Sequence, residues 1–195
     1  MARKKGIKKD RHPILEDEFL KIIFLTTNDD TMNKATKLKL LRVYTILYYS
    51  GCRISEINDF TLDNINYIIE HKNFVLEDTK TNTTQLLKFN DVGIKAISDL
   101  DFSDCKNAIF YKNGSDIPMA HCGLRNLVNK HLEIQLNKLY TTHSFRAGYV
   151  TQIVEATGNI GTAQKLARHR SRKTTLAYIS STEKQQNDAL DKVFK

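Results

Sequence analysis

The sequence has no tryptophan, only two prolines and three cysteines, and these shortages already exclude several classes of protein. No apolar run approaches the roughly 20 residues that a membrane-spanning helix needs, and no apolar segment follows the basic N-terminus as a secretory signal requires. Cys52, Cys105 and Cys122 lie far apart and in no metal-ligand spacing. Their odd number and wide separation predict reduced thiols in an intracellular protein.

Positive charge, in contrast, is in excess. The net charge is +8 and the pI is about 9.3, which indicates a polyanionic partner, with nucleic acid the first candidate. Residues 1–12 are rich in Lys and Arg and are expected to form a flexible basic arm. Residues 13–195 suffice for one sizeable core rather than two domains. A basic RNA-binding module is an alternative, but no RNA-recognition motif is present.

The hydrophobic pattern predicts a mainly α protein with a small three-stranded antiparallel sheet. The expected strands are residues 65–70, 73–78 and 85–89, which are short, β-rich and separated by turns. A brief extended piece is expected at residues 108–114. Helical periodicity covers residues 13–25, 33–50, 54–60, 91–100, 121–136, 143–158, 161–168 and 174–180. Gly51 follows the second of these segments and predicts its C-terminal stop.

Two pairs of polar residues lie at helical spacing. In "HSFR", His143 and Arg146 are three residues apart, so an anion between them would relieve their mutual repulsion. In "GCRISE", Arg53 follows the helix stop and Glu56 lies three residues on, where a carboxylate could orient an arginine toward a phosphate. Each pair, taken alone, is more often a solvated surface pair that contributes little.

Two further candidates depend on chain turns. Lys80 lies in a predicted turn between strands, where a long protonated side chain could reach into a groove and donate a proton, although a plain polar hairpin is the commoner case. His169 and Tyr178 are nine residues apart and would point opposite ways on one helix. They converge only if the chain breaks in "RSRKTT", with Ser171 or Thr174 capping a new helix. Otherwise Tyr178 is a half-buried core tyrosine.

Together these residues form a pattern that resembles a known family. The order Arg53, Lys80, His143, Arg146, His169, Tyr178 is similar to the catalytic set of the tyrosine recombinases, also called phage-integrase-type recombinases. "LYYSGCRISEI" looks like the first arginine box of that family. "HSFRAGYVTQIVEATGNIGTAQKLARHRSRKTTLAYIS" looks like its second box. The resemblance covers residues 13–195 and implies the catalytic-domain fold of these enzymes.

The resemblance implies a site-specific DNA recombinase that cuts and rejoins DNA through a 3′-phosphotyrosyl intermediate, with integration, excision or inversion as the outcome. Tyr178 would be the nucleophile, and Arg53 and Arg146 would stabilise charge on the scissile phosphate. His143 and His169 would add hydrogen bonds, with His143 accepting the tyrosine proton. The remaining roles fall to Lys80, which would protonate the leaving 5′ oxygen, and to Glu56, which would orient Arg53.

The resemblance also implies partners. No ATP or metal cofactor is expected, because the covalent intermediate conserves the phosphodiester energy. Double-stranded DNA is the expected substrate, and a homotetramer on DNA would form through the C-terminal tail, residues 181–195. Accessory DNA-binding proteins and a cytoplasmic, nucleoid-associated location in a prokaryote, virus or mobile element are also expected. The alternatives are a type IB topoisomerase-like nicking-closing enzyme and a catalytically silent DNA-binding protein of the same fold.

Two departures from the family pattern stand out. Arg168 occupies the position before the second histidine, where the family usually has glycine. It could add a phosphate contact or crowd the turn, and it is grouped with the basic residues expected to face DNA: Arg168, Arg170, Arg172 and Lys173. In addition, only the basic arm precedes the catalytic domain. A minimal recombinase, like the short inversion recombinases that switch fimbrial genes, or one domain of a longer protein would account for this.

Overall fold

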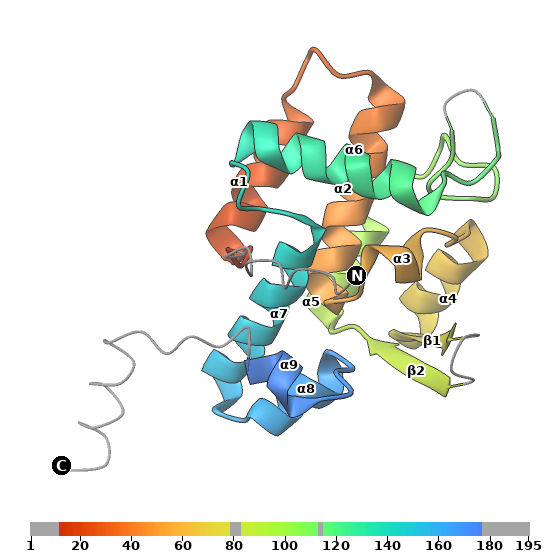
Figure 1. Cartoon of the computed structure of the whole chain (residues 1–195). Helices are drawn as coiled ribbons and strands as arrows, with labels where there is room; N and C mark the ends of the chain where they lie inside the picture. The colour runs from red at the N-terminus through yellow and green to blue at the C-terminus, as the bar shows by residue number, and fades with distance from the viewer. Residues whose placement is uncertain (1–11, 79–82, 113–114, 177–195) are drawn as a thin grey trace, which may run out of the picture.

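A computed structural model of the chain describes residues 12–78, 83–112 and 115–176 (Figure 1). The described part is mainly helical with one small antiparallel sheet, the fold class that the sequence predicts. Its elements in chain order are α1 (Glu16–Thr27), α2 (Lys34–Ser50), α3 (Ile54–Ile57), α4 (Leu62–His71), β1 (Asn73–Asp78), β2 (Thr83–Lys88), α5 (Asp91–Ser98), α6 (His121–Gln135), α7 (Thr142–Thr157), α8 (Ile160–Leu166) and α9 (Arg172–Leu176).

Helix α2 lies at the centre of the main core, and α1, α5 and α7 pack against it (Figure 1). Its start is set by Asn33, whose side chain accepts a hydrogen bond from the Thr36 amide at 2.9 Å. Its end is set by Gly51, which adopts the left-handed conformation with φ of 58°. Buried apolar residues, among them Leu40 and Leu47, fill this core. The predicted stop at Gly51 is therefore confirmed.

The sheet has two strands rather than the three predicted. β1 and β2 form an antiparallel hairpin in which Phe74 pairs with Leu87. The third predicted strand, residues 65–70, is instead part of α4. Thr61 caps this helix by accepting from the Asn64 amide, and Ile65 and Ile68 are buried on one helical face. The β-branched isoleucines of this segment favour a strand by propensity. The N-terminal cap and the three-residue spacing of the buried isoleucines instead match a helix.

The extended piece predicted at 108–114 is represented by two isolated antiparallel bridges, between Thr61 and Ala108 and between Tyr111 and Pro118. It is held on α2 by the buried Lys39, which donates to the Tyr111 carbonyl at 2.9 Å.

Among the described residues, none of the helices combines the length and the apolar composition that a membrane-spanning segment requires.

Helix α7 connects the main core to a smaller one that lies between α7 and α8, and α9 packs beside α8 (Figure 1). Gly158 ends α7 with φ of 64°. Residues 167–171 separate α8 from α9, so the chain breaks where the sequence predicts. Ser171 accepts from the Lys173 amide through its hydroxyl at 3.3 Å, whereas Thr174 lies inside α9. The break removes the geometric objection to convergence after His169; Tyr178 itself lies outside the described residues.

Candidate functional site

Arg146 is the centre of the candidate site. It lies in the second turn of α7 and is almost fully buried. Its guanidinium donates through Nη1 to the Gly51 carbonyl at 2.8 Å, through Nη2 to the Ala167 carbonyl, and through Nε to His169 Nε2 at 3.0 Å. One side chain therefore joins α7, the end of α2 and the turn after α8. His143, one helical turn earlier, is exposed.

His169 is held at both ring nitrogens. Because the Nε–H of Arg146 is a donor, His169 Nε2 is the acceptor and the ring proton belongs on Nδ1. The Nδ1–H group donates a hydrogen bond to the hydroxyl oxygen of Thr175, which lies 2.9 Å from Nδ1. The backbone of His169 also exchanges hydrogen bonds with Gln164. The imidazole is thus fixed in one tautomer and one orientation.

Burial lowers the pKa of His169 to about 4, and the positive charges of Arg146, Arg53 and Arg168 act in the same direction. The imidazole is therefore neutral at pH 7 in the absence of DNA. A phosphate anion placed among these cations would offset their repulsion and raise this pKa again. The clustered cations create a positive electrostatic potential that would attract an anionic ligand.

Arg53 and Glu56 form the second half of the site, at the junction of α2 and α3. Arg53 Nη1 donates to Glu56 Oε1 at 2.6 Å, and the Arg53 amide donates to Oε2 at 2.7 Å. The Arg53 side chain is 42% exposed and that of Glu56 is 16% exposed. Glu56 thus accepts hydrogen bonds from both the backbone amide and the guanidinium of Arg53, while the arginine side chain remains accessible from solvent.

Arg168 occupies an unexpected place. It adopts the left-handed conformation with φ of 56°, the conformation that glycine takes without strain. Its side chain is only 6% exposed, and Nη2 donates to Glu56 Oε2 at 2.8 Å. Arg168 therefore forms an internal ion pair where the sequence suggested a surface contact to DNA. Burial by itself raises the pKa of Glu56, but the charge of Arg168 and the hydrogen bonds from Arg53 hold it below its ordinary value.

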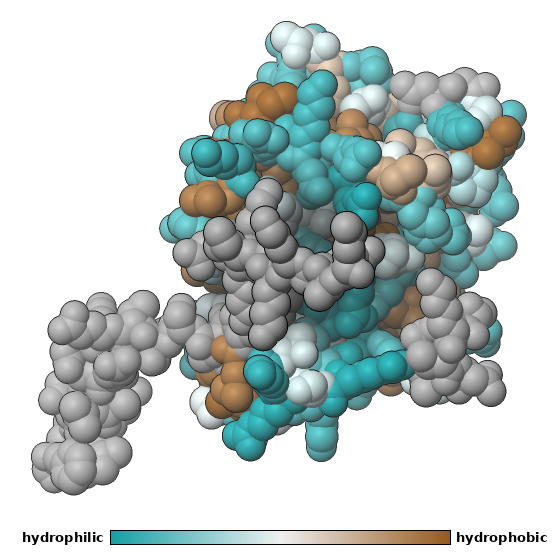
Figure 2. Space-filling view, viewed as in Figure 1, coloured by the Kyte–Doolittle hydropathy of each residue, from teal (hydrophilic) through white to brown (hydrophobic). Residues whose placement is uncertain are grey.

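The other basic residues of this region lie at the surface. Arg170, Arg172 and Lys173 are exposed in the α8–α9 turn and on α9. Figure 2 shows a largely hydrophilic surface over this lower part of the molecule. These residues are placed where a polyanion could approach the site.

Two predicted site residues, Lys80 and Tyr178, lie outside the described residues. The structure in turn adds two groups that sequence reasoning missed, the Thr175 hydroxyl and the Gly51 carbonyl. Thr175 lies six residues after His169, and the helix is interrupted between them, so helical periodicity does not predict that the two side chains meet. A backbone carbonyl has no signature in side-chain patterns. Neither group could have been found from the sequence.

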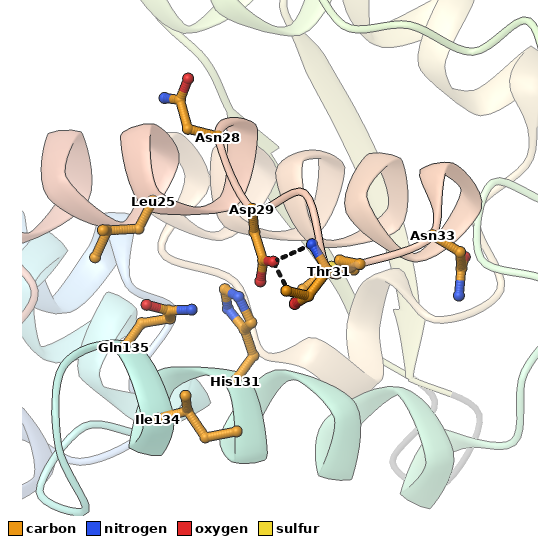
Figure 3. Close-up of a pocket in the computed structure, with 9 residues that line it drawn as sticks. Leu25, Asn28, Asp29, Thr31, Asn33, His131, Ile134 and Gln135 are labelled. Atoms are coloured by element: carbon orange, nitrogen blue, oxygen red, sulfur yellow. Dashed lines mark hydrogen bonds between the residues drawn. The ribbon is translucent and has the colours of Figure 1, made fainter.

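A hollow of about 650 Å³ lies elsewhere, between the α1–α2 turn and α6 (Figure 3). Asp29 points into it and accepts hydrogen bonds from the amide and hydroxyl of Thr31. His131 also lines it and is hydrogen-bonded through Nδ1 to the Tyr44 hydroxyl at 2.7 Å. None of the candidate site residues contributes to this hollow.

Comparison with known proteins identifies a matching family and relatives that align with most of the chain. The model of the phage integrase family matches residues 14–185. Tyrosine recombinase XerD of Staphylococcus haemolyticus is 23% identical over 173 residues, covering 83% of this chain and 57% of its own. A probable integrase/recombinase of Acholeplasma phage L2 is 26% identical over 179 residues, covering 86% and 57%. The chain thus spans little more than half the length of these curated relatives.

Solved structures with the same fold include the XerA recombinase and XerH bound to its difH substrate before cleavage. The XerA structure superposes with a TM-score of 0.71 at 15% identity, covering 94% of this chain and 66% of XerA. The XerH structure gives a TM-score of 0.65 at 12% identity, covering 100% and 58%. At these identities the likeness concerns the fold.

Proposed function

Because the chain belongs to the phage integrase family, we propose that it is a site-specific DNA recombinase that cuts and rejoins DNA through a covalent phosphotyrosyl intermediate. The observation that carries this proposal is the position of Arg146. Its hydrogen bonds bring together His169 and the carbonyl of Gly51, two residues before Arg53, which are 23 and 95 residues away along the chain. A protein that only binds DNA has no evident need for a buried arginine fixed against a neutral histidine.

In the proposed reaction, Tyr178 attacks the scissile phosphorus. The bond between the tyrosine oxygen and phosphorus forms as the bond from phosphorus to the 5′ oxygen breaks. The tyrosine proton passes to His143, and Lys80 protonates the leaving 5′ oxygen. The phosphodiester energy is kept in the 3′-phosphotyrosyl bond, so the reverse attack by a 5′ hydroxyl rejoins DNA without ATP.

Arg53 and Arg146 would contribute electrostatic stabilisation. Negative charge accumulates on the non-bridging oxygens as phosphorus becomes pentacoordinate, and a preorganised guanidinium stabilises it without rearrangement at the moment of reaction. Arg146 is preorganised by its bonds to two carbonyls and His169. Arg53 is accessible from solvent and tethered by Glu56 at its base.

DNA itself would be gripped largely through phosphates. Arg170, Arg172 and Lys173 are exposed beside the site, and the basic arm of residues 1–12 adds charge. Binding should therefore weaken steeply as salt rises. A crystallised lambda integrase is a dimer bound to a COC′ core site, and XerH is bound to difH. By likeness to them we propose double-stranded DNA as the substrate. From the resemblance of the sequence to tyrosine recombinases we further propose a tetramer on DNA joined through residues 181–195 and aided by accessory proteins.

The biological outcome depends on the layout of the recombination sites rather than on the active site. Integration, excision and inversion, as in the short fimbrial-switch recombinases, are all compatible with the proposed chemistry. The relatives come from bacteria and from a phage. We propose the same setting for this protein, acting on DNA in the cytoplasm.

A nicked suicide substrate tests the proposal. Radiolabelled duplexes with a randomised core and a nick near the scissile position should yield a covalent protein–DNA adduct that survives denaturing electrophoresis. Tyr178→Phe should yield none, because phenylalanine has no oxygen to attack phosphorus. Tyr67→Phe, which changes an exposed tyrosine on α4, is the matched control and should react normally.

An adduct retained by Tyr178→Phe would contradict the assignment of the nucleophile. DNA retardation without any adduct in the native chain would indicate a silent DNA-binding protein. Relaxation of supercoiled plasmid without strand exchange between two sites would indicate a topoisomerase-like enzyme.

A further inference from the structure

One carboxylate in the site is shared by two arginines. Glu56 accepts from Arg53 Nη1 through Oε1 at 2.6 Å, and from Arg168 Nη2 through Oε2 at 2.8 Å. Arg53 reaches into solvent, whereas Arg168 is almost fully buried. The three residues come from the α2–α3 junction and from the turn that carries His169, 112 residues further along the chain.

The position of Arg168 is energetically unfavourable by itself. A left-handed φ is strained for any residue that carries a Cβ. Nε of Arg168 is also buried and has no hydrogen-bond partner among the described residues. A glycine would avoid both penalties. A buried guanidinium also needs a counter-charge, and Glu56 provides it.

The ion pair also changes the charge around Arg53. Arg53 and Glu56 alone would form a neutral pair, and the carboxylate would compete with a phosphate for the guanidinium. Arg168 gives Glu56 a second, buried cation and leaves the group of three with a net charge of +1. Because Arg168 and Glu56 are largely shielded from water, this attraction is screened less than that of the exposed Arg53.

We propose that Arg168 is a positioning residue that engages Glu56 so that Arg53 can turn its guanidinium from the carboxylate to a DNA phosphate. This role depends on the proposed recombinase function. It also ties the turn that carries His169 to α3, through Arg168 Nη1 on the Leu166 carbonyl at 3.3 Å and Nη2 on Glu56. Arg168 acts on DNA only through Arg53 and needs no contact of its own.

The test is the single-turnover rate of adduct formation at saturating nicked DNA. Arg168→Gly should lower this rate about tenfold, the factor that corresponds to one pKa unit of altered interaction, with little change in DNA affinity. Arg168→Lys keeps the charge and should stay within about threefold of the native rate. In Arg168→Gly/Glu56→Gln the competing carboxylate is gone, so the rate should recover at least about threefold relative to Arg168→Gly alone.

A recovery of the rate without a recovery of the unfolding free energy in urea separates this role from a purely structural one. Neutralising a buried carboxylate that has lost its partner can restore a purely structural loss, but it would then restore both quantities. Lys72→Gly is the matched control. Lys72 is the other described non-glycine residue with a left-handed φ, at 57°, and its partner Asp91 is exposed. This variant should cleave at the native rate.

A native rate for Arg168→Gly, or a double variant no faster than Arg168→Gly, would overturn the inference. If Arg168→Gly does not fold, Arg168→Gln should show the same loss and the same recovery. NMR titration of the Glu56 carboxyl gives a readout without DNA: its pKa should rise in Arg168→Gln and not in Arg168→Lys. An unchanged Glu56 pKa would refute the ion pair itself. A native chain that shows the Glu56 shift but no adduct would refute the proposed function and not the pairing.

Discussion

Substitution of Gly51 by alanine should destabilise the protein and displace the site together. Gly51 adopts φ of 58°, and a Cβ placed on it would lie 2.3 Å from the Tyr149 ring. The left-handed conformation costs an L-residue about 1–2 kcal/mol. Forcing a methyl group against a packed ring adds about 1–3 kcal/mol. The expected loss of unfolding free energy is therefore about 2–5 kcal/mol.

Gly158→Ala provides the matched control. Gly158 has a similar φ of 64° and ends α7, but a Cβ there meets nothing within 4 Å. Alanine there should cost only the conformational part, about 1–2 kcal/mol. With a urea dependence of about 2 kcal/mol per molar, the denaturation midpoint should fall by about 1–2.5 M for Gly51→Ala and about 0.5–1 M for Gly158→Ala.

The same substitution should slow DNA cleavage, because the Gly51 carbonyl accepts from Arg146 and the next residue but one is Arg53. The adduct assay at saturating DNA measures this effect, and Gly158→Ala should react at the native rate. Equal midpoints for the two alanine variants would refute the steric argument. A Gly51→Ala protein that is destabilised yet cleaves normally would show that the carbonyl does not hold Arg146 in its working position.

Two further predictions concern His169. Thr175→Val removes the buried hydroxyl that accepts from His169 Nδ1 and should cost about 1–3 kcal/mol of unfolding free energy in urea. Thr175→Ser keeps the bond and should cost clearly less, and equal losses would contradict this hydrogen bond. Because the pKa of His169 falls from 6.5 to about 4 on folding, the unfolded chain binds more protons between these values. Stability should therefore rise by about 1–3 kcal/mol from pH 4 to 6.5. This part of the slope should vanish in His169→Gln, and an unchanged slope would show that His169 titrates normally.

Local features of the structure were largely predictable from the sequence. Asn33 and Gly51 bound α2 because a cap and a left-handed stop act within a few residues. The break before α9 was also predictable, from the polar run and Ser171. The predicted strand at residues 65–70 was wrong, because β-branched residues also occupy buried helical faces and the cap at Thr61 starts a helix before them.

The sequence by itself determined the family, the order and spacing of the site residues, and the mainly helical class, since each depends on residue type and local periodicity. Only the tertiary structure decided which of these residues meet. Arg146 joins Gly51 to His169, and Arg168 turns inward to Glu56, because the α2–α3 junction packs against the turn after α8. Contacts between segments some 100 residues apart depend on how the helices pack, and no local pattern encodes them.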